Sequence, residues 1–440
     1  MMIGGRYNKV WEPQYEMMPR KELKTLQLER LKHQLKVVYQ KVPFYRAKLQ
    51  ELGITPDDVK SLDDIVRLPF TSKNDFRDNY PYGLMAVPLS EVVRVHASSG
   101  TTGKPIIAPY TARDIDVWAN LIARNLASAG VHKGDVIQNA YGYGLFTGGL
   151  GYHYGGERLG ATVIPASVGN TKRQLMLIQD LGTTVIACTP SYALILAETA
   201  QELGINLAAT NLRVAVCGAE PWTEPMRAEI EAKMGITAID NYGLTEIVGP
   251  GVSCECRCKH GMHIWEDHFL AELVDPATGK PLAFGEPGEL VLTTLTKEAL
   301  PVIRFRTHDL VTLYSGECEC GRTTVRMSKV RGRTDDMLII RGVNVFPTQI
   351  ESALLSVEGV APHYQIILDR ERHLDEIEIW VEVSEAVASD EMRGLKEMEE
   401  KVQREINSVL GISARVKLVE PHTIARTEGK ARRVIDRRQL

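Results

Sequence analysis

The chain has 440 residues, more than one hydrophobic core usually organises, so at least two domains are expected. With 44% hydrophobic residues, 25% charged residues and a net charge of −4, it lacks the charge pattern of proteins that bind nucleic acid or anionic membranes. No apolar run reaches the length of a membrane span, and residues 1–20 lack the apolar segment of a signal peptide, so we expect a cytoplasmic protein.

Residues 20–50 carry apolar side chains at helical spacing among many charged ones, which predicts one amphipathic helix. The apolar positions are Leu23, Leu26, Leu31, Leu35 and Val38.

A loop rich in small and hydroxyl residues lies between two strand-like runs, 91–97 and 105–109. Such residues let backbone N–H groups close around a polyanion, with a lysine as the countercharge. We therefore interpret the loop as a nucleotide phosphate loop in a compact hairpin, and not as a flexible linker. A Walker A loop fits poorly, because Pro105 follows the lysine and the two glycines are too close together. The loop residues are Ser98, Ser99, Gly100, Thr101, Thr102, Gly103 and Lys104.

From about 110 to 245, helical segments alternate with short apolar runs, which predicts an α/β fold with mainly parallel, helix-covered sheets. The strand candidates are 136–137, 162–164, 185–187, 213–216 and 236–239. In such sheets, ligands collect at the carboxyl ends of strands. Two polar motifs follow the last two predicted strands, Gly218-Ala-Glu-Pro221 and Asn241-Tyr-Gly-Leu-Thr-Glu246.

The last hundred residues predict a small α+β domain with a helix at 347–355, a strand at 374–383 and a second helix at 390–410. Ser389 is the expected N-cap of the second helix, and Gly411 is expected just after its end. We place the junction within 332–337, which gives domains of residues 1–333 and 334–440.

Seven cysteines are present, and Cys188 and Cys217 lie in apolar strand-like runs that predict buried thiols. The other five suggest a metal rather than disulfides in a reducing compartment. They lie in two segments, Cys254-Glu-Cys-Arg-Cys258, which is followed by His263, and Cys318-Glu-Cys-Gly321.

Four Cys and His ligands from two loops would complete a tetrahedral zinc site of structural type, because every coordination position would be filled. The expected ligands are Cys256, His263, Cys318 and Cys320. Cys254 or Cys258 can replace Cys256, since alternation along a strand puts all three on one face. The alternative is a set of reduced surface thiols.

Five motifs occur in a characteristic order along the chain. They are Ser98-Ser-Gly-Thr-Thr-Gly-Lys-Pro105, Tyr242-Gly-Leu-Thr-Glu246, Arg304-Phe-Arg-Thr-His-Asp309, Gly332-Arg-Thr-Asp-Asp336 and Arg426-Thr-Glu-Gly-Lys430. With this set the chain resembles the adenylate-forming (acyl-CoA synthetase) superfamily. The segments 141–148 and 337–347 also resemble its phenylacetate–CoA ligase branch.

The resemblance implies an AMP-forming ligase that activates an aryl carboxylic acid, phenylacetate or similar, with ATP and Mg²⁺, and passes the acyl group from the acyl-adenylate to coenzyme A. It also implies a small mobile C-terminal lid domain. Two alternatives stay open: an adenylating enzyme with a carrier protein or amine as acceptor, and a non-catalytic nucleotide-binding protein. The oligomeric state is open as well, with a homodimer favoured by analogy.

The charges of the reaction indicate the main roles. A carboxylate must approach an anionic α-phosphate, so the site has to neutralise negative charge. Glu246 is the natural magnesium ligand, and Thr245 beside it can hydrogen-bond the α-phosphate. The resemblance assigns Asp309 to the ribose hydroxyls, and the alternative is a structural partner of Arg304 or Arg306.

The remaining roles also come from the resemblance. The adenine pocket would be lined by Glu220, Pro221, Asn241 and Tyr242, Arg333 would contact the nucleotide, and Asp335 would be the hinge. Lys430 would bridge the substrate carboxylate and the α-phosphate during adenylation, and would leave when the small domain rotates. Aromatic walls beside glycines suit a flat ring, so the acyl pocket candidates are Tyr141, Phe146 and Ala219.

Overall fold

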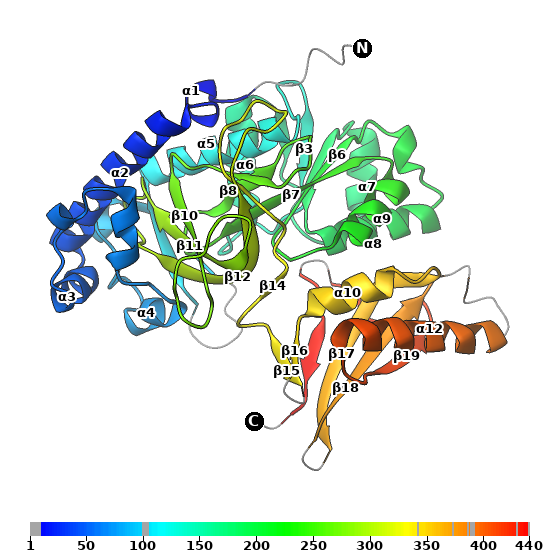
Figure 1. Cartoon of the computed structure of the whole chain (residues 1–440). Coiled ribbons are helices and arrows are strands. Elements are labelled where there is room, and N and C mark those ends of the chain that lie inside the picture. Colours follow the sequence, from blue (N-terminus) through cyan, green and yellow to red (C-terminus); the bar gives the residue numbers. More distant parts are fainter. Residues whose placement is uncertain are drawn as a thin grey trace. The chain divides into compact units, whose positions relative to one another are not determined.

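The structure is a computed structural model that divides into two compact units (Figure 1). It describes residues 10–98, 105–340, 343–371, 374–384, 387, 392–427 and 430–438. Unit 1 comprises Met1–Cys188, Ala208–Ala219 and Thr237–Lys329. Unit 2 comprises Thr189–Leu207, Glu220–Ile236 and Val330–Leu440. Within the described ranges, no helix combines the length and the apolar character that crossing a membrane requires.

The N-terminal segment of unit 1 forms two helices where the sequence analysis predicts one. Helix α2 (Arg20–Lys41) ends before Val42, and α3 (Pro43–Glu51) begins directly after it. Val42 has an extended backbone, with φ −114° and ψ 103°. Proline has no N–H to donate and disfavours the helical conformation of the residue before it, so Pro43 divides the predicted helix.

Short elements surround these helices. They are α1 (Pro13–Glu16), η1 (Pro56–Asp58), η2 (Leu62–Arg67), α4 (Lys73–Asp78) and η3 (Leu89–Glu91). The chain then forms the predicted hairpin from β1 (Val92–Ala97) and β2 (Ile107–Thr111), which pair antiparallel. Both strands of the prediction are confirmed.

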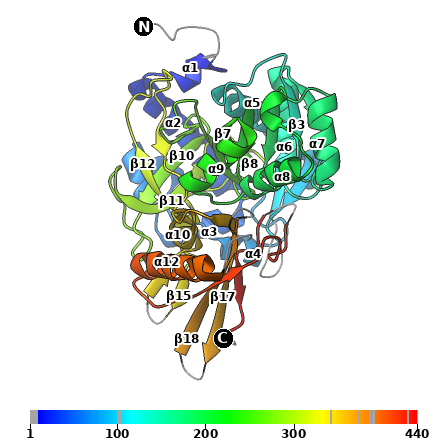
Figure 2. The ribbon, with the colours of Figure 1, turned by 90° about the vertical axis from the view of Figure 1, so that its right-hand side faces the viewer.

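The parallel sheet predicted for residues 110–245 is present. Its strands are β3 (Val136–Asn139), β4 (Thr162–Ile164), β5 (Val185–Cys188), β6 (Val214–Cys217) and β7 (Thr237–Leu244), in the order β7-β6-β5-β3-β4. Helix α5 (Ala112–Ser128) precedes β3, and the helices between the strands are α6 (Gly148–Leu159), α7 (Thr171–Asp180), α8 (Pro190–Glu202), η4 (Leu207–Ala209) and α9 (Glu224–Met234). Helices α6 and α7 both pack against β3 (Figure 2).

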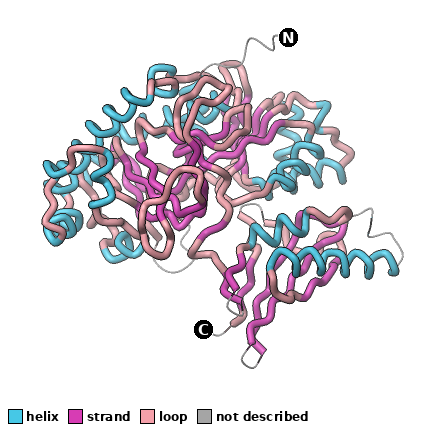
Figure 3. Tube along the Cα trace, in the orientation of Figure 1, coloured by secondary structure: helices cyan, strands magenta, loops and turns pink. Residues whose placement is uncertain are grey.

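The same sheet continues beyond β7 as an antiparallel half that the sequence analysis does not describe. The further strands are β8 (Gly249–Glu255), β9 (Met262–Ile264), β10 (Phe269–Val274), β11 (Pro287–Thr294), β12 (Phe305–Tyr314) and β13 (Arg326–Met327), in the order β7-β8-β9-β13-β12-β11-β10. Figure 3 shows the strands of the chain in magenta. The sequence pattern places Asn241 and Tyr242 after the last predicted strand. They lie within β7 instead, because β8 pairs with β7 as far as Leu244.

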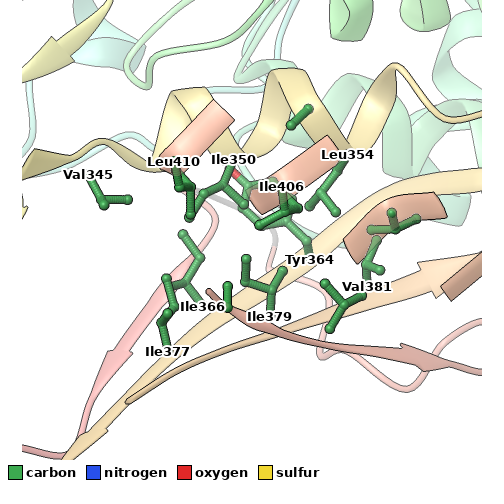
Figure 4. Packing of buried hydrophobic residues seen from close by; sticks show 14 of the residues in the cluster. Val345, Ile350, Leu354, Tyr364, Ile366, Ile377, Ile379, Val381, Ile406 and Leu410 are labelled. Carbon is green, nitrogen blue, oxygen red and sulfur yellow. The ribbon is translucent and has the colours of Figure 1, made fainter. Parts of the chain in front are cut away.

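In unit 2, residues 330–440 form an α+β arrangement. Its elements are β14 (Gly332–Arg333), β15 (Leu338–Ile340), β16 (Val343–Val345), α10 (Pro347–Leu355), β17 (Val360–Glu371), β18 (Leu374–Val383), α12 (Met392–Leu410), β19 (Arg415–Val419) and β20 (Val434–Asp436). The sheet order is β19-β18-β17-β20, and β15 pairs with β16. The apolar faces of α10 and α12 cover this sheet, with Ile350, Ile406 and Leu410 in one buried cluster with Ile366 and Ile379 (Figure 4).

The predicted helix 347–355 and strand 374–383 are confirmed. Helix α12 ends at Leu410, and Gly411 follows with a φ of 67° and donates its N–H to the Asn407 carbonyl. This is the expected left-handed glycine after a helix. Ser389, the expected N-cap, lies outside the described residues.

Candidate functional site

Three buried aromatic side chains connect segments that carry predicted site residues. The His96 ring on β1 meets the rings of Tyr110 on β2 and Trp118 on α5 edge to face, and the latter two stack at 5.2 Å. His96 bonds the Leu145 carbonyl through Nδ1, at 3.0 Å. Burial lowers the pKa of His96, which favours the neutral ring. The cluster thus joins the phosphate-loop hairpin to segment 141–148.

The same cluster holds the segment that follows Glu246. Tyr110 donates its hydroxyl to the Val248 carbonyl at 3.1 Å, and Trp118 donates its indole N–H to the Pro250 carbonyl at 2.7 Å. The sequence alone does not single out these three aromatic residues. Aromatic spacing in the sequence does not distinguish such a cluster from an ordinary core. What distinguishes it is the set of backbone carbonyls that it binds.

Ser98 lies where the phosphate loop leaves β1. Its N–H donates to the Ile106 carbonyl at 2.9 Å, and its hydroxyl accepts the Ile106 N–H at 3.0 Å. These two bonds close the base of the loop. The other loop residues lie outside the described part of the chain: Ser99, Gly100, Thr101, Thr102, Gly103 and Lys104.

Thr245 and Glu246 lie in the turn between β7 and β8. The N–H groups of Ile247 and Val248 both donate to the Leu244 carbonyl, at 3.1 and 3.2 Å. Glu246 is only 6% exposed. The turn therefore holds a nearly buried carboxylate at the carboxyl end of β7, the edge where ligands of parallel sheets collect.

Tyr242 and Asp309 meet, although 67 residues separate them in the sequence. The tyrosine hydroxyl donates to Asp309 Oδ2 at 2.5 Å, and Asp309 is 3% exposed. Arg304 and Arg306, the alternative partners of Asp309, form ion pairs with Glu272 and Glu289. The contact of Asp309 with another predicted nucleotide residue is one that the sequence analysis does not anticipate.

The side chain of Asn241, on β7, is held by the neighbouring strand β6. Its side-chain amide donates to the Cys217 carbonyl at 2.7 Å. A Cβ atom on Gly218 would lie 2.5 Å from both the amide nitrogen and the carbonyl oxygen of Asn241, so the backbone can approach only because position 218 is a glycine. Ala219 follows with a positive φ of 72° and is exposed.

The two aromatic candidates for the acyl pocket lie in different environments. Tyr141 is buried, stacks on Tyr152 at 5.3 Å and donates its hydroxyl to the Cys188 carbonyl at 2.6 Å. Phe146 is 53% exposed. The first side chain is therefore tied into the packing of unit 1, while the second has much of its ring accessible.

In unit 2, Glu220 contacts the segment that contains Lys430. One carboxylate oxygen of Glu220 accepts the Ser191 N–H at 2.8 Å, and the other accepts the Ala431 N–H at 3.0 Å. Lys430 itself is exposed, as is Pro221. Two predicted site segments thus meet within this unit.

Arg333 and Asp335 form a two-pronged ion pair, with nitrogen–oxygen distances of 2.9 and 3.1 Å. Arg333 also pairs with Asp336 at 3.1 Å. The predicted hinge is therefore a short charged turn whose side chains bind one another.

The four predicted zinc ligands come together in unit 1. The ligand atoms of Cys256, His263, Cys318 and Cys320 all lie within 4.8 Å of one another. His263 Nε2 is 3.4 Å from the Cys320 sulfur, while its Nδ1 bonds the Thr324 hydroxyl at 3.0 Å. This second contact fixes the ring and directs Nε2 toward the sulfurs, as in histidine ligands of metals.

The surrounding backbone explains which cysteine joins the cluster. Strand β8 ends at Glu255, so the strand alternation expected across Cys254, Cys256 and Cys258 does not hold. The Cys254 thiol is directed to the Asn125 carbonyl, 3.6 Å away, and burial raises its pKa. In the second loop, Gly321 has a φ of 87° and donates to the Cys318 carbonyl, which forms a tight turn of the kind found in zinc knuckles.

Comparisons with known proteins agree with this architecture. The AMP-binding enzyme family model matches residues 21–295, and the AMP-binding enzyme C-terminal domain model matches residues 342–438. Over 444 residues the chain is 52% identical to the phenylacetate-coenzyme A ligase of Thermus thermophilus, covering 98% of this chain and 100% of that protein.

Solved structures of 2-hydroxyisobutyryl-CoA ligase are similar along the whole chain. The postadenylation state in complex with R3-HIB-AMP has a TM-score of 0.91 at 32% identity and covers 96% of this chain and 91% of that one. The thioesterification state in complex with 2-HIB-AMP and CoA has a TM-score of 0.71 at 33% identity and covers 97% and 92%. The chain therefore belongs to the AMP-binding enzyme family and, within it, to the phenylacetate–coenzyme A ligases.

Proposed function

We propose that the protein is an AMP-forming ligase that activates phenylacetate, or a similar aryl acid, with ATP and transfers the acyl group to coenzyme A. Its 52% identity to a phenylacetate-coenzyme A ligase along that protein's whole length supports this function. The observation that carries it is the bond between Tyr242 and Asp309 beside the Glu246 turn. It joins two residues that the family resemblance assigns to one nucleotide.

Asp309 binds the ribose hydroxyls, for which a carboxylate is a good double acceptor, and Tyr242 lies against the adenine. The short bond between the two side chains supports these roles, because it fixes the orientation of both groups before ATP arrives. Asn241, Glu220, Pro221 and the phosphate loop complete the nucleotide site.

Glu246 holds Mg²⁺, and Thr245 donates to the α-phosphate. A single, nearly buried carboxylate in a rigid turn suits this ion, which prefers one or two carboxylates together with phosphate oxygens and water. When bound, the ion neutralises phosphate charge. The protein groups then hold the α-phosphate where the aryl carboxylate can attack it.

Residues 334–440 form the mobile lid of the enzyme, and residues 1–333 form the larger domain. Asp335 is the hinge, and Arg333 contacts the nucleotide in one of the lid positions. Two states named for a relative of 32–33% identity, postadenylation and thioesterification, support a lid that moves between half-reactions. Lys430 bridges the acid and the α-phosphate only in the adenylation half-reaction.

The Cys256, His263, Cys318 and Cys320 cluster binds a structural Zn²⁺. Three thiols and one imidazole match the donor set that zinc prefers, and with four protein ligands no position stays open for a substrate. The ion would fasten the loop around 318–321 to the end of β8.

Tyr141, Phe146 and Ala219 line the acyl pocket. The hydroxyl of Tyr141 is fixed by its hydrogen bond, which supports a role as a rigid wall of the pocket. The ring of Phe146 is accessible, which supports a role as a side chain that closes on the substrate.

The test is AMP formation from ATP, with and without CoA, across a panel of aryl and fatty acids. Fast turnover on phenylacetate or another aryl acid, and only with CoA, is expected. Pyrophosphate release that is independent of CoA would instead indicate a carrier protein or an amine as the acceptor. No pyrophosphate release with any acid would indicate a non-catalytic nucleotide-binding protein.

A further inference from the structure

Lys297 carries a buried ammonium group. It lies between β11 and β12, is 6% exposed, and its Nζ has no hydrogen-bond partner among the described residues. The nearby Asp114 carboxylate is occupied by the backbone N–H groups of Glu298 and Ala299, at 2.8 and 2.9 Å. Burying an ammonium in this way is costly, so an apolar residue would be more stable at this position.

The ammonium does have one close neighbour, the ring of Tyr110. Nζ is 3.4 Å from the ring centroid, which is a cation–π contact. A cation over the ring face draws electron density from the phenol and strengthens its hydroxyl as a donor. That hydroxyl binds the Val248 carbonyl, two residues beyond Glu246.

A direct ligand role for Lys297 does not fit the space around it. The cavity beside its side chain, lined by Asp114, Ile247 and Val248 among others, has a volume of about 10 Å³. Such a volume holds no more than one water molecule. Within the part of the chain that the structure describes, Lys297 can therefore act on the site through the side chains that it touches.

We infer that Lys297 is a positioning residue, which acts through Tyr110 to hold the turn that carries Thr245 and Glu246. Trp118, which stacks on the Tyr110 ring, supports the same segment through its bond to the Pro250 carbonyl. The inference rests on the proposed function, in which Glu246 holds the metal of MgATP.

The experiment compares Lys297→Met, Tyr110→Phe and the double variant with the wild type. Binding of Mn²⁺ in the presence of ATP, measured by electron paramagnetic resonance, reports the metal site without any turnover. Each single change is expected to weaken Mn²⁺ binding by about 3- to 10-fold, the size of a cation–π contact or one hydrogen bond. The double variant should bind Mn²⁺ as tightly as the single variant with the lower affinity, because both changes interrupt the same chain of contacts.

Three further measurements separate positioning from general structure. The melting temperature of Lys297→Met should equal or exceed that of the wild type, and its KM for phenylacetate should be unchanged. Lys280→Met, which removes an exposed lysine of the same unit, should bind Mn²⁺ like the wild type. Tyr110→Phe keeps the ring and its packing but removes the bond to the Val248 carbonyl. It therefore tests the contact between Tyr110 and the turn even if Lys297→Met folds poorly.

Unchanged Mn²⁺ affinity in Tyr110→Phe, or in folded Lys297→Met, would overturn the inference, and so would losses that multiply in the double variant. Failure of the proposed function has a different signature. The wild type would then bind Mn²⁺ and ATP but form no AMP with any acid and CoA.

Discussion

The hydrogen bond from Tyr242 to Asp309 spans 2.5 Å between strands that are not neighbours in the sheet. Strands β8, β9 and β13 lie between β7 and β12 in the sheet order. At the usual strand spacing, a flat sheet would separate β7 from β12 by about 19 Å, beyond the reach of a tyrosine. The antiparallel half of the sheet must therefore curl, and the curl brings the two side chains together.

Replacing Tyr242 with phenylalanine should weaken ATP binding more than it weakens the fold. The variant keeps the ring against adenine but removes the bond that orients Asp309 toward the ribose, so ATP has to order this carboxylate on binding, at a cost of about 1–3 kcal/mol. We expect the KM for ATP to rise about 5- to 100-fold, measured by pyrophosphate exchange with saturating phenylacetate. An unchanged KM for ATP would contradict the placement of this pair at the nucleotide.

Gly218→Ala should also act on the nucleotide site. The new Cβ would lie 2.5 Å from the Asn241 amide nitrogen, and Asn241 would have to give up its bond to Cys217. The affinity for ATP, measured by calorimetry, should fall at least several-fold. Gly394→Ala is the matched control, since a Cβ there meets no atom within 4 Å and alanine favours the helix.

Local signals in the sequence predict the elements whose cause is local. The helix at 347–355, the hairpin around the phosphate loop and the buried parallel strands follow from turn residues, caps and apolar runs. The break between α2 and α3 has a local signal too, in Pro43, but apolar spacing on both sides of it conceals the division.

What the sequence does not reveal depends on contacts between distant segments. The antiparallel half of the sheet has an irregular register between β11 and β12, and its β9 pairs with β13, which lies far along the chain. Asp309 meets Tyr242 only through the curl of that sheet, and Lys297 meets Tyr110 from a loop far along the chain. Cys256 could not be separated from Cys254 and Cys258 because that choice depends on where β8 ends.

Zinc should be present at about one equivalent in protein purified without added metal. Cys256→Ser removes a ligand whose sulfur lies 3.7 Å from that of Cys318, so this variant should lose the metal and melt at a lower temperature. Cys254→Ser is the control, because its thiol is directed to Asn125 and it should keep zinc. Less than about half an equivalent in the wild type would contradict the zinc site.

The buried pair of Arg124 and Asp267 should make the stability of the protein depend on pH in acid. Two bonds of 2.6 and 2.9 Å join the side chains. Burial alone would raise the pKa of Asp267, but His268 and Arg124 outweigh it and hold that pKa well below its usual range. The pair therefore contributes stability above the unfolded pKa of about 4, and this contribution is lost as the pH falls below it.

Asp267→Asn should lower the stability by about 3–5 kcal/mol at neutral pH, because it leaves the buried arginine with less compensation. The difference in melting temperature between wild type and variant should shrink as the pH falls from about 6 to about 3. A difference that is constant over this range would show that Asp267 does not titrate with unfolding.

Lys430→Ala should separate the two half-reactions. The lysine is exposed beside Ala431, whose N–H binds Glu220, so losing its side chain should leave this contact and the fold intact. Without the bridging charge, acyl-adenylate formation should slow by about 100- to 1000-fold, the usual cost of removing one group that stabilises charge in the transition state. Thioester formation from preformed phenylacetyl-adenylate and CoA should proceed near the wild-type rate, since the lysine has left the site by then.

Single-turnover assays of each step provide the measurement, with Lys417→Ala as a control for a lysine on β19 of the same unit. An equal loss in both steps would mean that Lys430 stays in the site throughout, and that the lid does not alternate between two positions.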